Sequence, residues 1–332
     1  MVDAPPPDAA PPPCNYTEKS DASNDPTADV PMPEATMVTV GSAPQILCGT
    51  ANPGHYNPDT RTVDADAYRV TVAADANLVV RFAGGPAAAA AAATVDLSVF
   101  VFATEENLLL FGAHANPLIR DHGAFLIALP AGTYDVVVNV SNPADLAAPF
   151  DYKVQLAPDG PTRCAAVTAP ASYTEAADGT GAGNDVVAID FDAEPFFKLT
   201  TSATDAAEPT GLTIDGSTPV RIAGSSADED AEDDYMDRDT YLVRTGPATD
   251  ELTLRLDWAD EHTDLNYVVM PADQADPISS VGDGLGFEGH QEYNVVAVKP
   301  NSAYWIWVGS HDGSTVLPAT YDLSICGTIT FR

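Results

Sequence analysis

The feature that most constrains this chain is an internal repeat whose unit is about half of the chain long. Its clearest marker is an Asp-x-Asp-x-Tyr motif that leads into an alternating apolar strand, at 64–68 and again at 237–241. The two tyrosines stand 241 − 68 = 173 residues apart. Other paired segments keep a similar spacing: 41–49 with 216–224, 131–134 with 301–304, and 16–18 with 173–175. A repeat of this length predicts a duplicated domain, because solenoid units are only about 20–50 residues long.

The length of the chain agrees with a duplication. At 332 residues it is long enough for about two domains, and each half can bury a core of its own. We therefore expect an Asp/Ala/Pro-rich linker at 1–13, a first domain at 14–160 and a second domain at 161–332.

The charge is strongly acidic and excludes some classes of partner. There are 14 Lys and Arg against 49 Asp and Glu, a net charge of −35. Such a chain repels nucleic acid and anionic membrane surfaces, so neither is expected as a partner. The carboxylates predict either calcium binding or, for most of them, a solvated surface. The sequence has no apolar run of 18 residues, and so no membrane span is expected.

The first 13 residues are rich in Asp, Ala and Pro. They lack the basic and apolar regions of a signal peptide, and their composition is typical of an extended linker. Such a linker is expected just after the processing site of an exported or lipid-anchored bacterial protein. We therefore expect an extracellular or bacterial cell-surface location.

The four cysteines are widely spaced and form no Cys-x-x-Cys pair: Cys14, Cys48, Cys164 and Cys326. In an exported chain an even number of such cysteines indicates two disulfides, although four buried thiols are an alternative. Three connectivities are open. Cys14 and Cys164 each precede a Tyr-Thr-Glu, which favours one bridge per domain, Cys14–Cys48 and Cys164–Cys326.

Almost every segment after residue 34 has the pattern of a short strand. Leu97, Val99 and Val101 alternate with Ser98 and Phe100, a period of two that indicates a half-buried strand. Many such segments, separated by turn residues, predict an all-β chain with two tandem antiparallel β-sandwich domains of jelly-roll-like type. The stretch before 216–224 is longer than its counterpart before 41–49, which predicts an insertion. We interpret the alanine run 87–93 and the acidic run 228–234 as loops.

The order of motifs in each half resembles a known family. The first half has an opening acidic segment with Asn24-Asp25, the Asp-x-Asp-x-Tyr strand, Asp96-Leu97, Gly132-Thr133-Tyr134 and Tyr152-Lys153-Val154. The second has Asn184-Asp185, the repeated strand, Asp264-Leu265, 304–308 and Tyr321-Asp322-Leu323. Each half resembles a bacterial pre-peptidase C-terminal domain, the β-sandwich module of secreted proteases that is related to collagenase collagen-binding domains. The second half departs from the pattern at Ser302, where the family has glycine.

The resemblance implies a calcium site between the opening acidic segment and the Asp-x-Asp turn. Calcium takes six to eight oxygen ligands. In the first half they would come from Glu18, Asp21, Asn24, Asp25, Asp64 and Asp66, and in the second from Glu175, Asp178, Asn184, Asp185, Asp237 and Asp239. The opening motif is looser than that of the family, with Asp21 and Asp178 where a second Glu is common. The alternative is that these residues cap turns.

No pattern in the sequence predicts an enzyme. The six histidines form neither an HExxH motif nor an i, i+4 pair, and there is no Gly-x-Ser-x-Gly elbow or phosphate-binding loop. Ser310-His311-Asp312 cannot form a catalytic triad, because three consecutive residues cannot fold back on one another. The flanking glycines indicate a turn instead.

The densest aromatic cluster, 304–307, places Trp305 and Trp307 on one face of a strand and Tyr304 and Ile306 on the other. We expect the tryptophans to face the core; an exposed tryptophan face would instead bind glycan or protein. The function expected is non-catalytic binding or adhesion to an extracellular polymer, matrix or surface protein. The alternatives are a self-associating subunit of a surface layer or fibre, and an accessory region of a secreted hydrolase.

Overall fold

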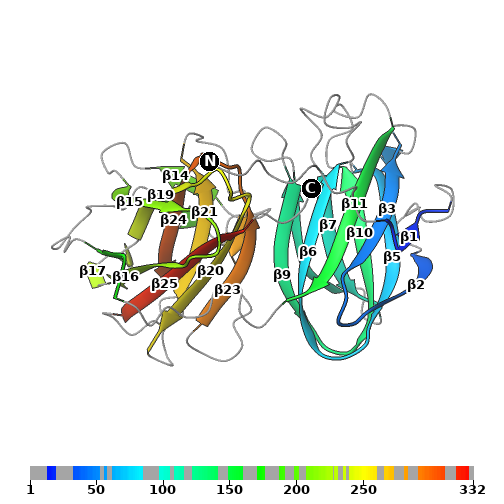
Figure 1. Ribbon diagram of the computed structural model, residues 1–332, viewed down its shortest axis with the longest axis horizontal. Coiled ribbons are helices and arrows are strands. Elements are labelled where there is room, and N and C mark those ends of the chain that lie inside the picture. Colours follow the sequence, from blue (N-terminus) through cyan, green and yellow to red (C-terminus); the bar gives the residue numbers. More distant parts are fainter. Residues whose placement is uncertain are drawn as a thin grey trace, which may run out of the picture.

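The structure is a computed structural model of the whole chain (Figure 1). It describes residues 13–19, 33–52, 56–57, 62–84, 97–104, 108–115, 122–140, 149–159, 170–175, 187–190, 198–201, 207–226, 228–230, 235–236, 239–259, 265–272, 280–282, 291–310 and 319–328. The linker 1–13 and the alanine run 87–93 lie outside these residues, apart from Pro13.

The all-β class is confirmed for this part of the chain, whose regular elements are all strands. Among the same residues no helix is long and apolar enough to cross a bilayer.

The first half contains two sheets. Sheet A has the strand order β1 (Tyr16–Thr17), β3 (Gln45–Ala51), β11 (Phe150–Pro158), β6 (Ala76–Gly84) and β9 (His122–Leu129). Sheet B has the order β2 (Glu34–Val40), β5 (Thr62–Val72), β10 (Gly132–Val140), β7 (Leu97–Ala103) and β8 (Leu108–Ala115), and β4 (Tyr56–Asn57) also pairs with β5.

The second half repeats the strand order of both sheets, without a described counterpart of β4. Sheet C has the order β12 (Tyr173–Thr174), β16 (Val220–Ser226), β25 (Ala319–Thr328), β20 (Glu251–Trp258) and β23 (Gln291–Ala297). Sheet D has the order β15 (Glu208–Ile214), β19 (Asp239–Thr245), β24 (Ala303–Ser310), β21 (Leu265–Pro271) and β22 (Ser280–Gly282). The repeat found in the sequence is therefore a repeat of topology.

Two short hairpins have no counterpart among the described strands of the first half. β13 (Val187–Asp190) pairs with β14 (Lys198–Thr201) inside the predicted insertion. β17 (Asp228–Asp230) pairs with β18 (Tyr235–Met236). The acidic run 228–234 was interpreted as a loop, and this was wrong for its first three residues, because backbone pairing with β18 makes them a strand.

The expectation of purely antiparallel sheets was also wrong. The outermost strand at one edge of each sheet runs parallel to its neighbour: β1 to β3, β2 to β5, β12 to β16 and β15 to β19. Each such pair is joined through a strand or a longer segment rather than by a tight turn. A parallel pair needs such a crossover, and no sequence pattern records the direction of a strand.

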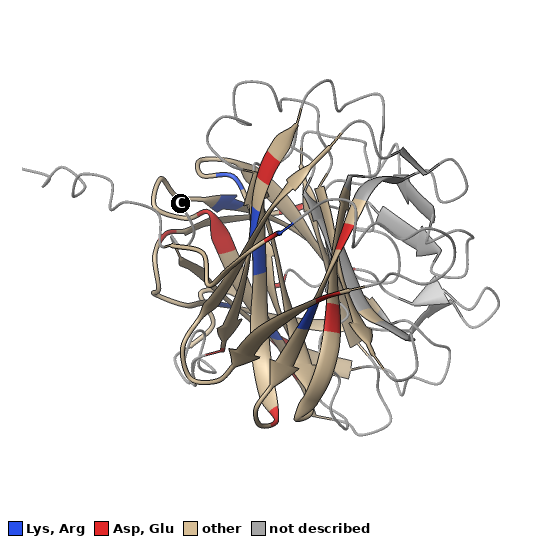
Figure 2. Ribbon diagram, turned by 90° about the vertical axis from the view of Figure 1, so that its right-hand side faces the viewer, with Lys and Arg blue, Asp and Glu red and all other residues tan. Residues whose placement is uncertain are grey.

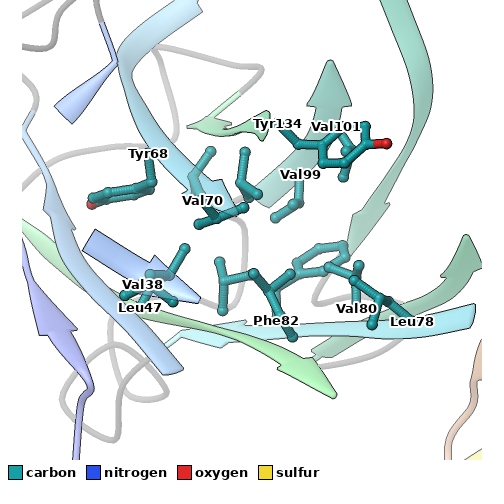
Figure 3. Close-up of a cluster of buried hydrophobic side chains, with 14 of the residues drawn as sticks. Val38, Leu47, Tyr68, Val70, Leu78, Val80, Phe82, Val99, Val101 and Tyr134 are labelled. Carbon is teal, nitrogen blue, oxygen red and sulfur yellow. The ribbon is translucent and has the colours of Figure 1, made fainter. Parts of the chain in front are cut away.

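The core of each half lies between its two sheets and is filled by alternate residues of both. Figure 3 shows part of the core of the first half. Leu97, Val99 and Val101 of β7 point into the first core, as their alternation predicted, and meet Val80 and Phe82 of β6 across it. In the second core Tyr304, Ile306 and Val308 of β24 occupy the corresponding face. Each half thus buries an apolar cluster of its own, which is the main source of its stability.

The halves meet where β9 and β23, the edge strands of sheets A and C, lie side by side (Figure 1). Figure 2 turns the first half toward the viewer. On its described strands basic and acidic positions are interspersed rather than gathered into one patch.

Candidate functional site

The Asp-x-Asp-x-Tyr strand of the first half places an acidic side chain inside the protein. Asp66 and Tyr68 are two residues apart on β5 and point to the same side, and both are fully buried. The Tyr152 hydroxyl donates a hydrogen bond to Asp66 Oδ2 and lies 2.5 Å from the Tyr68 hydroxyl. Because the Tyr152 proton points to Asp66, Tyr68 donates to Tyr152. A buried carboxylate needs such donors, since burial without them is costly.

The second half builds the same arrangement from the repeated strand. The Tyr321 hydroxyl of β25 donates to Asp239 Oδ2 and lies 2.5 Å from the Tyr241 hydroxyl. Asp239 and Tyr241 are again fully buried on one strand. We call Tyr68–Tyr152–Asp66 and Tyr241–Tyr321–Asp239 the tyrosine–aspartate chains. Their duplication shows that this use of the motif belongs to the repeated unit.

A glycine makes room for each chain. A Cβ atom on Gly49 would overlap the hydroxyls of Tyr152 and Tyr68, and one on Gly224 would overlap those of Tyr321 and Tyr241. The two glycines are the last residues of the repeated segments 41–49 and 216–224. A close approach of tyrosine to backbone therefore explains why glycine is needed there.

The opening segment of each half lies against its tyrosine–aspartate chain. The Tyr16 ring meets the Tyr68 ring edge to face at 6.1 Å, and its hydroxyl donates to Glu34 Oε2 at 2.6 Å. Glu18 Oε2 accepts the Thr50 backbone N–H at 3.0 Å. A disulfide between Cys14 and Cys48 ties the same segment to β3, which confirms the first predicted bridge.

The second half repeats these contacts with Tyr173 and two glutamates. Tyr173 packs edge to face on Tyr241 at 6.4 Å and donates to Glu208 Oε1 at 2.5 Å. Glu175 Oε2 accepts the Ser225 backbone N–H at 2.6 Å. Cys326 is buried in β25, whereas its predicted partner Cys164 lies outside the described residues. The bridge between them stays a prediction.

The pKa values of the tyrosines in the two tyrosine–aspartate chains are strongly raised. Burial, followed by the negative charge of Asp66, raises the pKa of Tyr68 and of Tyr152 well above the ordinary value. Burial and Asp239 do the same to the pKa values of Tyr241 and Tyr321. All four hydroxyls therefore stay protonated at neutral pH, as donors within a fixed network.

Four of the twelve predicted metal ligands have described side chains: Glu18, Asp66, Glu175 and Asp239. Asp66 and Asp239 are buried acceptors of tyrosine hydroxyls, a role that the sequence did not predict. Asp64 is placed on β5 by its backbone only. The others lie outside the described residues: Asp21, Asn24, Asp25, Asp178, Asn184, Asp185 and Asp237. Within the described part, no three acidic, histidine or cysteine side chains gather closely enough to hold a metal ion.

The two tryptophans of β24 lie on the outer face of sheet D, and the expectation that they face the core was wrong. The core side of β24 is Tyr304 and Ile306. Trp307 is nevertheless buried, with 1% of its surface exposed, while Trp305 is partly exposed. Alternation separated the two faces correctly but cannot say which face is covered.

The outer face of sheet D differs from the equivalent face of sheet B. Trp305 lies opposite Leu242 of β19 and Met270 of β21, and we call these three residues the Trp305 row. The equivalent row of sheet B is Arg69, Asp135 and Phe102. Arg69 donates to both carboxylate oxygens of Asp135, at 2.9 and 3.0 Å. The same place thus carries an ion pair in the first half, and in the second half the partly exposed Leu242 and Trp305 beside the buried Met270.

No family model and no curated sequence matches this chain. Solved structures similar to it include the pre-peptidase C-terminal domain of a collagenase from Bacillus anthracis, with 15% identity over 37% of this chain and 98% of that one, at a TM-score of 0.26. They also include the CUB1-EGF-CUB2 domains of rat MASP-1, with 8% identity, 88% and 100% coverage and a TM-score of 0.21. A third is a putative secreted protein from Eubacterium rectale, with 10% identity, 86% and 75% coverage and a TM-score of 0.21.

Proposed function

We propose that this chain is an exported, non-catalytic binding protein made of two tandem β-sandwich modules of the pre-peptidase C-terminal type. Its ligand is an extracellular polymer, a matrix component or a surface protein. The disulfide between Cys14 and Cys48 supports an oxidising compartment. The acidic side chains buried on β5 and β19 accept hydrogen bonds from tyrosines and thus serve the fold, which favours a binding role over a catalytic one.

The observation that carries the proposal is the contrast between the two outer rows. At equivalent places the first module has the Arg69–Asp135 pair, and the second has Leu242 and Trp305, both partly exposed. A tryptophan on a regular sheet offers a large apolar face with little conformational entropy left to lose on binding. We therefore assign the ligand contact to the Trp305 row, with Trp307 as its buried neighbour on the same strand face.

An exchange of rows tests this assignment. The double variant L242R/W305D gives the second module an ion pair that the first module already tolerates at the same place. The full chain would be incubated with chitin, cellulose and fibrous collagen, and the retained fraction measured. We expect the wild type to be retained on at least one of these polymers and the variant to bind it at least about tenfold more weakly, about 1.4 kcal/mol.

The controls separate loss of binding from loss of fold. W305F should keep part of the affinity, because it retains an aromatic face, and F102A in the first module should keep all of it. Far-ultraviolet circular dichroism of L242R/W305D should match that of the wild type. Retention of the wild type on none of the polymers, or equal retention of the folded double variant, would contradict the proposal.

Assembly through the edge strands β2 and β15 is disfavoured as an alternative. The parallel edge strands β2 and β15 each lose register with their neighbour, between Ala35 and Thr39 and between Pro209 and Thr213. Bulges of this kind protect an edge from pairing with another chain. An accessory role beside a hydrolase domain is compatible with the binding function.

We also propose that each module binds calcium at its opening acidic segment. The described part supplies one such carboxylate per half beside the tyrosine–aspartate chain, Glu18 and Glu175, and the remaining ligands would come from the predicted set. Asp66 and Asp239 are better regarded as structural, because each already serves a tyrosine. Asp64→Asn is therefore the sharper variant, and Asp237→Asn is its counterpart in the second module.

Calcium binding would appear as thermal stabilisation, because the ion binds the folded state only. The melting temperature in millimolar calcium should exceed that in chelator at the same ionic strength. Asp64→Asn should abolish the contribution of the first module to this rise in melting temperature, and Asp237→Asn should abolish that of the second module. Each single variant should therefore keep part of the rise. If the wild type melts at the same temperature in both buffers, the acidic residues cap turns and bind no metal.

A further inference from the structure

The two halves are joined by the same face of each module. Register across the sheets makes β6 equivalent to β20 and β9 equivalent to β23, since each pair holds the same place in sheets A and C. At the junction Val79, Ala124 and Leu126 of the first half pack against Val295 and Ala297 of the second. All five are nearly or fully buried. Leu126 and Val295 are themselves equivalent positions, because each lies opposite an equivalent residue, Val79 or Thr253.

A buried ion pair crosses the junction beside this apolar cluster. Arg81 of β6 donates to both oxygens of Glu251 of β20, from Nε at 2.7 Å and from Nη2 at 2.9 Å. The side chains are 2% and 0% exposed. Gln155 and Thr328 make longer contacts to the same pair, at 3.3 and 3.4 Å. A fully desolvated, bidentate ion pair is sensitive to substitution of either member, because the loss of one leaves the charge of the other buried and uncompensated.

Three further hydrogen bonds fix the position of one half on the other. The backbone N–H of Leu126 donates to Asn294 Oδ1 at 2.9 Å, and a ring nitrogen of His122 lies 3.0 Å from the Asp250 carbonyl oxygen. The Tyr293 hydroxyl donates to Asp159 Oδ2 at 3.2 Å. Apolar packing, an ion pair and directional hydrogen bonds together are the composition of a specific protein–protein interface.

Equivalent positions on the two faces differ in a way that sets the choice of partner. Register places Asn77 of the first half where the second has Glu251. If two first halves met in this way, each Arg81 would face an amide and would be buried without a carboxylate. In the second half the equivalent of Arg81 is Arg255, which donates to both oxygens of Asp257 on its own strand. The face of a first half is therefore complementary to the face of a second half and not to the face of another first half.

We propose that these faces are a matched docking pair, and that the first half of one chain can dock on the second half of another copy. In the described part of the chain, no sheet contains strands from both halves. The halves can therefore separate without breaking a sheet, and the contacts that hold them together within one chain could also form between two chains. In a single chain the connecting segment raises the effective concentration of the partner face to about the millimolar range. Closure within the chain then dominates, and exchange between copies follows when that closure is broken or the copies are crowded.

Complementary charge reversals test the proposal in full-length chains. R81E places a second carboxylate opposite Glu251, and E251R places a second guanidinium opposite Arg81, so each variant alone should open at the junction. Mixed in equal amounts, the two chains can pair reciprocally, and one of the two inter-chain junctions then restores the native Arg81–Glu251 pair while the other carries the same pair reversed. We expect X-ray scattering to show a larger maximum dimension for each variant than for the wild type, and light scattering to show a new species of twice the chain mass in the mixture only.

Two controls complete the design. The double variant R81E/E251R should be compact again, with the mass and dimensions of the wild type. R69D, at an ion pair that is 42% exposed at the arginine and lies on sheet B rather than on the junction strands, should change neither quantity. Single variants with the dimensions of the wild type, or a mixture that contains open chains without the new species, would overturn the proposal.

A second measurement covers the case in which a charge reversal fails to fold. Chains carrying Leu126→Cys would be mixed at rising concentration with chains carrying Val295→Cys, with the wild-type charges in place, and disulfide-linked dimers counted. We expect dimers between the two variants to exceed those formed by Leu126→Cys alone by at least about tenfold. Equal yields, or no linked dimer at millimolar concentration, would overturn the matched docking pair.

Discussion

At the scale of single residues, each half contains one buried tyrosine whose hydroxyl links an aspartate to a second tyrosine. Tyr152 donates to the buried Asp66 and accepts from Tyr68, and Tyr321 does the same between Asp239 and Tyr241. The aspartates need these donors more than the tyrosines need each other, since a buried carboxylate loses far more than a hydroxyl when its partner is removed.

The first prediction compares the middle tyrosine of a tyrosine–aspartate chain with its terminal tyrosine. Tyr152→Phe removes the donor to Asp66 and should lower the free energy of unfolding by about 2–4 kcal/mol. Tyr68→Phe removes only a terminal hydroxyl and should cost about 0.5–1.5 kcal/mol. Denaturant unfolding measures both, and Tyr321→Phe and Tyr241→Phe should repeat the order in the second half. Equal losses for the members of a pair would contradict a chain of donation that runs from Tyr68 through Tyr152 to Asp66.

The second prediction concerns alkaline pH. Burial and the aspartates raise the folded-state pKa of Tyr68 and Tyr241 above the unfolded value of about 10. The unfolded chain therefore releases these protons first as the pH rises. The stabilising contribution is complete below pH 10 and decreases above it, by about 1.4 kcal/mol per pH unit for each tyrosine until the folded pKa is reached.

Unfolding free energies at pH 9 and pH 11 measure this loss. The wild type should be clearly less stable at pH 11, and the variant Y68F/Y241F should show a smaller difference between the two pH values. The same difference in both proteins would mean that these tyrosines ionise as easily in the folded state as in the unfolded chain.

The sequence predicted the position of this site but not its role. Asp66 and Tyr68 were identified through the repeated motif, but Asp66 was expected in a turn before the strand, whereas β5 begins at Thr62 and includes it. Their common direction into the core could not be predicted, because Asp on an apolar face is normally a turn residue or a ligand. The signal that could have identified the role was the glycine that ends each repeated segment, together with Tyr152 and Tyr321 at equivalent places in the last strands.

At the scale of elements, the bulged edge strands show what the two halves share and where they differ. Thr36 of β2 donates to the Arg69 carbonyl oxygen at 2.7 Å, and Thr210 of β15 donates to the Leu242 carbonyl oxygen at 2.8 Å. The next residue has a left-handed backbone in both, with φ 70° at Gly211 and φ 59° at Met37. Glycine adopts this conformation without strain, whereas methionine does not.

The third prediction follows from that difference. Met37 is 92% exposed, so its side chain contributes little packing, and Met37→Gly should raise the free energy of unfolding by up to about 1 kcal/mol. The reverse change, Gly211→Ala, should lower it by a similar amount, since no atom lies within 4 Å of the added Cβ and only the backbone is strained. A destabilised Met37→Gly chain would show that Met37 makes a contact that its exposure does not suggest.

Regular strands were predicted well and irregular ones poorly. The long alternating segment of β7 has one apolar face and was found from its period. β1, β4 and β12 have two residues each, and β15 has a bulge that shifts its alternation. A period of two cannot be recognised in such strands. Their pairing partners lie far away in the sequence, which is why the parallel edges were also missed.

At the scale of the whole molecule, the two halves lock together through equivalent faces. The duplication was visible in the sequence, because repeated motifs keep their spacing. The junction was not, because Arg81 and Glu251 carry no motif and resemble surface charges in a chain with 49 acidic residues. Both side chains are buried where the two halves meet, beside the apolar cluster that joins the first half to the second.

Differential scanning calorimetry of the full chain at neutral pH tests this central claim most directly. The buried pair and the apolar cluster couple the halves, so we predict that the wild type unfolds in one transition whose van't Hoff and calorimetric enthalpies agree. Glu251→Gln, which leaves Arg81 buried without a charge partner, should split it into two transitions of unequal temperature. Two separate transitions in the wild type, or a single unchanged transition in Glu251→Gln, would contradict the claim that this junction makes the two halves one unit.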